Sequence, residues 1–256
     1  MLKKFLFLAG FSLTRIKSDA NKPVELNYDE NKIIDYVRAN NLSMSTTLSL
    51  QQTAIACKYI VMNKIPGDFV ECGVYKGGNA LIAAKIFDLY KINKKVYLFD
   101  TFTGMTKPTE YDLRTGDKSS FLPKYLSLRQ KEHTDWAYAS IEEVKENFKK
   151  INLLKDNVIF VKGKVESTLD QVSNIPNAIS FLRLDTDWYE SIKKELEILY
   201  KKLVSGGILV IDDYGHFDGV RKAVDEYFKK HSLPPFLSLI DIDNGARIGV
   251  KVTKNT

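Results

Sequence analysis

Cysteine is scarce in this 256-residue chain, and no apolar stretch approaches the roughly 20 residues needed to cross a bilayer. Its two cysteines, Cys57 and Cys72, are too few for a disulfide framework and lie in no CxxC or Cys/His pattern that ligates zinc. The apolar run 5–13 follows two lysines, and we expect it to be an N-terminal arm rather than a short signal peptide. These absences argue against disulfide-rich secreted classes and stable membrane insertion, and favour a reducing, cytoplasmic location.

Arginine-rich stripes are also missing, although the net charge is +6. The positive charge comes mainly from lysines spread along the chain, and no zinc-finger, basic-zipper or RNA-recognition spacing is present. The basic balance therefore predicts a lysine-rich surface and no nucleic-acid partner.

Strand and helix patterns alternate through most of the chain. The expected strands are 68–74, 95–102, 158–162, 179–184, 207–211, 236–241 and 247–252. The expected helices are 30–40, 49–63, 80–90, 141–150, 191–203 and 219–230. Such alternation predicts an α/β fold, Rossmann-like and doubly wound, with a mostly parallel seven-stranded sheet. The Asn244-Gly245 pair between the last two strands predicts a C-terminal antiparallel hairpin.

We expect residues 1–41 to form an N-terminal arm and helix, and residues 42–256 to form the main domain. The polar stretch 103–140 is too long for an ordinary connection, which predicts a lid or a loop that shapes an acceptor pocket. Homo-oligomerisation is a further expectation, with this stretch or the N-terminal arm at the contact.

Ligands of open α/β sheets bind beyond the carboxyl ends of the strands, so the residues there are the candidates for binding. Gly73, Gly77 and Gly78 follow the first strand with GxxxGG spacing, which permits a tight turn before a helix N-terminus. Asp100 ends the second strand, where a carboxylate can accept hydrogen bonds from a ribose diol or simply cap a turn. Gly163 follows the third strand, and the residues after it could flank a planar ring.

Carboxylates gather after the next two strands, with Asp185 and Asp187 in one stretch and Asp212 and Asp213 in the other. Like charges this close are unfavourable unless a positive charge balances them. A hard divalent cation such as Mg²⁺ is the simplest partner because it prefers carboxylate oxygens. Helix caps and surface charges are the alternative interpretation.

Four motifs in order resemble the macrocin O-methyltransferase family, whose members include sugar O-methyltransferases of macrolide and novobiocin biosynthesis. They lie at 66–78, 99–105, 185–191 and 206–214. The resemblance implies a class I methyltransferase fold. It also implies an S-adenosylmethionine- and Mg²⁺-dependent enzyme that methylates a hydroxyl of a sugar-containing acceptor.

The same resemblance assigns roles to individual residues. Asp187 corresponds to the general base, and the metal ligands correspond to Asp185, Asp212 and Asp213. Residues expected at the cofactor are Met44, Glu71, Gly73, Tyr75, Gly77, Asp100, Thr101, Gly163, Val165 and Asp185.

Three other functions stay open at this point. A metal-dependent hydrolase could use the same carboxylates, but it would not need the glycine turn together with Asp100. A non-catalytic assembly domain would be expected to lose Asp185 or Asp213, and both are present. A catechol-type O-methyltransferase would share the metal chemistry and differ in its aromatic acceptor.

Overall fold

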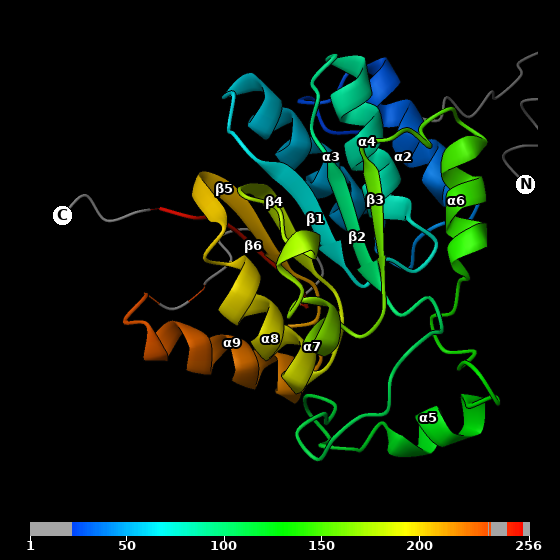
Figure 1. The fold of residues 1–256 in the computed structure, drawn as a ribbon, viewed down its shortest axis with the longest axis vertical. Helices are drawn as coiled ribbons and strands as arrows, with labels where there is room; N and C mark the ends of the chain where they lie inside the picture. The colour runs from blue at the N-terminus through cyan, green and yellow to red at the C-terminus, as the bar shows by residue number, and fades with distance from the viewer. Residues whose placement is uncertain (1–21, 235, 237–244, 253–256) are drawn as a thin grey trace, which may run out of the picture.

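Six strands formed by the described residues make one mixed sheet in the computed structural model, which describes residues 22–234, 236 and 245–252 (Figure 1). The strands are β1 Asp68–Cys72, β2 Val96–Asp100, β3 Val158–Lys162, β4 Ile179–Leu184, β5 Leu203–Ile211 and β6 Arg247–Val250. Their order is β3-β2-β1-β4-β5-β6, with β1 to β5 parallel and β6 antiparallel to β5. The α/β expectation is confirmed, whereas the count is six strands instead of seven. The expected strand 236–241 lies outside the described residues apart from Phe236.

Helices cover both faces of the sheet, as a mostly parallel sheet requires (Figure 1). Their bounds are α2 Tyr28–Ala39, α3 Thr47–Met62, α4 Gly78–Leu89, α5 Leu122–Leu128, α6 Ile141–Lys149, α7 Val165–Thr168, α8 Tyr189–Leu199 and α9 Asp218–Lys230. Helices α2, α3, α4 and α6 share one apolar core, and α7, α8 and α9 share the other. Among the described residues, we find no helix with the length and apolar content needed to cross a membrane.

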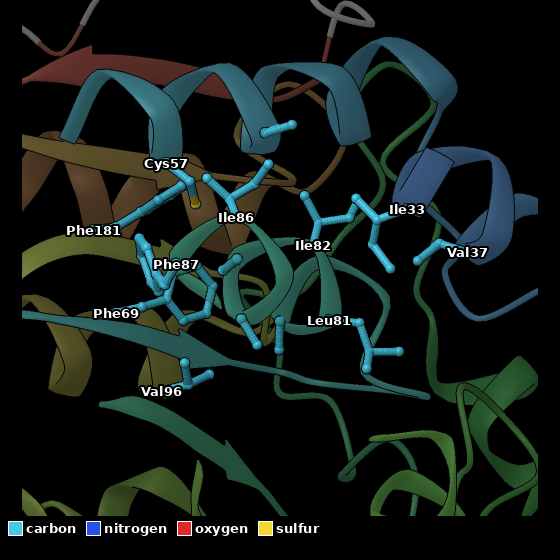
Figure 2. Packing of buried hydrophobic residues seen from close by; sticks show 14 of the residues in the cluster. Ile33, Val37, Cys57, Phe69, Leu81, Ile82, Ile86, Phe87, Val96 and Phe181 are labelled. Carbon is cyan, nitrogen blue, oxygen red and sulfur yellow. The ribbon is translucent and has the colours of Figure 1, made fainter. Parts of the chain in front are cut away.

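Alternating side chains of each strand supply the two cores. Phe69 of β1 and Phe181 of β4 point to the first core, where their rings meet edge to face at 5.1 Å. Figure 2 shows these rings packed with Ile86 and Phe87 of α4 and Cys57 of α3. Their neighbours Val70 and Leu182 point to the second core. Such two-sided burial fixes the register of the strands, because a shift by one residue would exchange the faces.

The strand order reverses between β1 and β4, which pair side by side in parallel. A crevice opens at such a switch point, beyond the carboxyl ends of the two strands. The chain there continues as Gly73 after β1 and as Asp185 after β4. The topology therefore brings the glycine turn and the first acidic stretch together.

Residues 103–140 have more structure than a simple loop. They contain α5, and short bridges join Leu113 to Ser120 and Arg114 to Phe217. Figure 1 shows this inserted segment beyond the carboxyl ends of the strands. Helix α5 and the single turn α7 were missed by the sequence analysis because neither has enough residues to display a helical period.

Candidate functional site

Gly73 sits where β1 and β4 approach each other most closely. Its φ is +83°, and a Cβ at this position would lie 1.9 Å from the carbonyl oxygen of Asp185. The Asp185 amide also donates to the Cys72 carbonyl at 2.8 Å. Any side chain larger than hydrogen would separate the two strand ends, so Gly73 fixes the place of Asp185.

Asp100 closes the glycine turn. Its Oδ2 accepts hydrogen bonds from the amides of Val74 and Tyr75 at 2.7 and 3.2 Å, and its Oδ1 accepts from the Phe102 amide at 2.7 Å. Burial raises the pKa of this carboxyl, while the three amide bonds act in the opposite direction. Asp100 therefore takes the turn-holding role that the sequence left open, and it also lines the adjoining cavity.

A cavity runs along the ends of β1, β2, β3 and β4. Eight of the expected cofactor residues line it: Met44, Gly73, Tyr75, Asp100, Thr101, Gly163, Val165 and Asp185. Glu71 lines a second cavity, and Gly77 lies against Val144 and Phe148 of α6. The structure thus gathers most of the expected set and places Gly77 in helix packing.

The second cavity adjoins the first and has an acidic wall. The residues common to both linings are Met44, Gly73, Tyr75, Asp185 and Asp187. Of the two cavities, only the second is lined by Glu71, Asp212, Asp213 and His216. His216 places Nδ1 3.5 Å from Asp213 Oδ1 while its side chain stays more than half exposed. A molecule in one cavity would therefore meet a molecule in the other at Asp185 and Asp187.

Arg183 is a fully buried cation beneath this wall. Its Nε lies 3.2 Å from Glu71 Oε1, and one terminal nitrogen lies 2.6 Å from Asp185 Oδ2 and 2.8 Å from Asp212 Oδ1. Burial raises the pKa of Glu71 to about 8 despite the guanidinium beside it. The three carboxylates in turn raise the pKa of Arg183 against the effect of its burial. Part of the clustered negative charge is therefore balanced by the protein itself.

Three carboxylates form the outer part of the site, since Asp185, Asp187 and Asp213 each offer an oxygen within 4.8 Å of the others. Asp187 has a φ of +65°, an uncommon backbone conformation that Asp tolerates better than most residues. Burial first, and neighbouring carboxylates next, raise the pKa of both Asp185 and Asp187. Three oxygen donors on rigid strand ends suit a hard cation such as Mg²⁺. The expected ligands Asp185 and Asp213 meet here together with the expected base, whereas Asp212 is paired with Arg183.

Arg183 was missed by the sequence analysis, which sought an external cation for the carboxylates. A signal was present, because a single charged residue stands inside a mostly apolar strand, and such a residue needs buried partners. The cavity-lining residues Gly104, Met105 and Thr106 were not singled out either. They belong to the inserted segment, which reaches the first cavity as well as the outer surface.

Comparison with known proteins agrees with this geometry. Residues 16–246 match the family described as Macrocin-O-methyltransferase (TylF). The chain is 31% identical over 206 residues to demethyldecarbamoylnovobiocin O-methyltransferase of Streptomyces niveus, covering 80% of this chain and 74% of that protein. It is 29% identical over 180 residues to mycinamicin III 3''-O-methyltransferase of Micromonospora griseorubida, covering 70% and 66%.

Solved structures give the same result for the fold. The O-methyltransferase NovP superposes with a TM-score of 0.69 at 27% identity, and the match covers 83% of each chain. The calicheamicin methyltransferase CalS11 superposes with a TM-score of 0.58 at 16% identity over 95% of this chain and 96% of that one, which supports the fold alone.

Proposed function

The chain belongs to the macrocin-O-methyltransferase family and is a methyltransferase, and we propose that it methylates a sugar hydroxyl using S-adenosylmethionine and Mg²⁺. The observation that carries this proposal is the shared wall between the two cavities. A methyl donor in the first cavity and an acceptor in the second would meet beside Asp185 and Asp187, as direct transfer between two bound molecules requires.

S-adenosylmethionine is proposed for the first cavity. Asp100 and Thr101 lie at the end of β2, where a ribose is bound in open α/β sheets. Gly163 and Val165 lie at the end of β3 and would flank the adenine. Met44 and Tyr75 lie on the wall between the cavities, where the sulfonium methyl must be presented.

Mg²⁺ is proposed for the outer carboxylates, with Asp185 and Asp213 as ligands. Asp212 is the proposed third ligand through Oδ2, since its Oδ1 lies beside Arg183. When bound there, the ion would supply Lewis-acid polarisation of the acceptor hydroxyls and hold them in place.

Asp187 is proposed as the general base. It lies on the common wall and within reach of the metal ligands, so it can face both the acceptor oxygen and the donor methyl. S-adenosylmethionine would supply its methyl group to the acceptor oxygen and leave as S-adenosylhomocysteine, and Asp187 would accept the hydroxyl proton.

A sugar is proposed as the acceptor because a relative from Streptomyces olivaceus, 31% identical over 183 residues, is named as a 4'-O-methyltransferase of a rhamnosyl-bearing tetracenomycin. A cytoplasmic location is part of the proposal, since Cys57 and Cys72 are buried free thiols that suit a reducing compartment.

The direct test incubates purified enzyme with S-adenosylmethionine, Mg²⁺ and a panel of nucleotide sugars, glycosides and catechols. We expect S-adenosylhomocysteine to form with a sugar-containing acceptor, and Asp187→Asn to lower kcat by about 100-fold or more. Turnover of catechols alone would contradict the sugar assignment. Failure of the protein to bind S-adenosylmethionine in a calorimeter would contradict the whole proposal.

A further inference from the structure

Asp112 is a fully buried carboxylate of the inserted segment. It is distant in sequence from the acidic wall, and it contacts the start of α8, the helix that follows the acidic stretch after β4. Its Oδ1 accepts a hydrogen bond from the Tyr189 amide at 2.8 Å, across 77 residues of chain. Its Oδ2 accepts from the Thr109 amide and hydroxyl at 2.7 and 2.8 Å. Both oxygens are therefore engaged, one with its own segment and one with the first residue of α8.

Helix α8 has no local side chain to cap its N-terminus. The residue before the helix is Trp188, which makes no side-chain capping bond. An unpaired amide buried at a helix start is unfavourable, and a carboxylate is the acceptor best suited to the positive end of the helix dipole. Asp112 supplies that acceptor from the inserted segment, so the start of α8 depends on a residue outside the helix.

The first turn of helix α9 packs closely against the same carboxylate. A Cβ at Gly219, in the first turn of α9, would lie 2.3 Å from Asp112 Oδ1. The Asp218 amide donates to the Leu113 carbonyl at 2.9 Å, next to Asp112 in the chain. The inserted segment is thus built into the starts of both helices that follow the acidic strand ends.

The proposed base Asp187 lies two residues before Tyr189. Its left-handed backbone conformation must be held by its surroundings, because few residues adopt it freely. On the β4 side, the Asp185 amide is bonded to the Cys72 carbonyl. On the α8 side, the Trp188 indole donates to the Thr106 carbonyl at 3.0 Å, and the Tyr189 amide donates to Asp112. The inserted segment therefore holds the backbone on the helical side of Asp187.

We propose that Asp112 is a positioning residue, which caps α8 from the inserted segment and thereby fixes the backbone that carries Asp187 toward the acceptor. This assignment rests on the proposed function for the role of Asp187. The inserted segment accordingly sets the geometry of the reaction in addition to covering the cavity.

The test compares Asp112→Ala with Asp112→Asn and Asp117→Ala. The asparagine keeps an Oδ1 that accepts from the Tyr189 amide. Asp117 is the matched control, because this exposed carboxylate of the same segment accepts from the amide and hydroxyl of Ser119, two residues away. Hydrogen–deuterium exchange of a peptide covering residues 186–192 reports the backbone directly, and steady-state kinetics report its consequence.

In Asp112→Ala we expect these amides to exchange about tenfold faster, because the helix start loses its cap. We expect kcat to fall about tenfold or more, while the KM for S-adenosylmethionine stays within about twofold. The KM for S-adenosylmethionine should change little because Met105, which lines the first cavity, is held apart from α8 by hydrogen bonds to Thr134 and Trp136. We expect Asp112→Asn to restore most of the slow amide exchange and most of kcat. We expect Asp117→Ala to behave like the unaltered protein.

Unchanged exchange in Asp112→Ala, or equal acceleration in Asp117→Ala, would overturn the proposal. Faster exchange with unchanged kcat would overturn it as well. If Asp112→Ala does not fold, Thr109→Val replaces it, since this change removes one donor to Asp112 Oδ2, and an effect of about threefold is expected. If the unaltered protein methylates no sugar, the proposed function fails, while the exchange comparison still decides the capping because it requires no acceptor.

Discussion

The acidic site has two parts that differ in what balances their negative charge. In the inner part, Glu71 and Asp212 lie against Arg183, which is inaccessible to solvent. In the outer part, Asp187 and Asp213 line the second cavity, and within the described part of the chain neither forms an ion pair with an arginine. Asp185 belongs to both, since one oxygen pairs with Arg183 and the residue also joins the outer group.

This difference separates carboxylates that have a buried counter-charge within the fold from carboxylates that do not. A buried charge is stable only when an opposite charge is buried beside it. The inner part must therefore assemble together with the sheet. The outer part leaves carboxylates for a proton, solvent or a cation to balance. The two parts should therefore respond in opposite ways to mutation.

The largest effect is expected from Arg183→Leu, which removes the counter-charge of the inner part. Three buried or half-buried carboxylates would lose their partner, and breaking such a pair costs about 3–5 kcal/mol of the free energy of unfolding. Urea denaturation followed by circular dichroism measures this change. Replacement of the exposed Arg38 by Leu is the control, and equal stability of the two variants would contradict the structural role of Arg183.

A smaller, pH-dependent effect is expected from Glu195→Gln. Glu195 of α8 is buried and accepts a hydrogen bond at 2.9 Å from the hydroxyl of Thr186, the residue between Asp185 and Asp187. Burial raises the pKa of Glu195 well above its ordinary value. The folded state then binds its proton more tightly than the unfolded state. The contribution of protonated Glu195 to the free energy of unfolding is complete below about pH 4.5. It is lost as the pH rises through the pKa of Glu195 in the folded protein.

Glutamine removes that dependence while keeping the shape and the bond to Thr186. The variant should therefore gain about 1 kcal/mol or more relative to the unaltered protein between pH 5 and pH 9. Urea denaturation at both pH values supplies the comparison. A constant difference across this range would show that Glu195 is charged in the folded protein.

The smallest change in stability is expected from Asp213→Asn in the outer part. Removing one of several like charges relieves repulsion, so the free energy of unfolding should stay within about 0.5 kcal/mol or rise. Methyl transfer should nevertheless be lost, because a proposed metal ligand is gone. A strong loss of stability would place Asp213 with the inner part.

Sequence patterns predicted the layered fold well, since apolar alternation and glycine or proline breaks are local features. The strand at 158–162 and the strand at 179–184 agree with β3 and β4 residue for residue. The site was predicted only in part. That Asp185, Asp187 and Asp213 meet follows from strand ends at one sheet edge, whereas the pairing of Arg183 with Asp212 depends on side-chain direction at two neighbouring strands.

The contact made by Asp112 could not be predicted from the sequence either. Its bond to Tyr189 joins residues 77 positions apart, and no periodicity within the inserted segment points to it. Gly77 was expected at the cofactor but lines neither of the two cavities, and a Cβ there would lie 3.1 Å from Val144 and Phe148. Local pattern thus indicates which edge of the sheet is functional, and tertiary packing decides which residues at that edge take part.

The Mg²⁺ dependence of methyl transfer, followed as S-adenosylhomocysteine formation on a sugar acceptor, decides whether a cation occupies the outer carboxylates. We expect EDTA to abolish turnover of the unaltered protein and added Mg²⁺ to restore it. We also expect Asp213→Asn to bind S-adenosylmethionine in a calorimeter and yet not to be restored by Mg²⁺. Full activity of the unaltered protein in EDTA would contradict the assignment of a cation to the outer carboxylates.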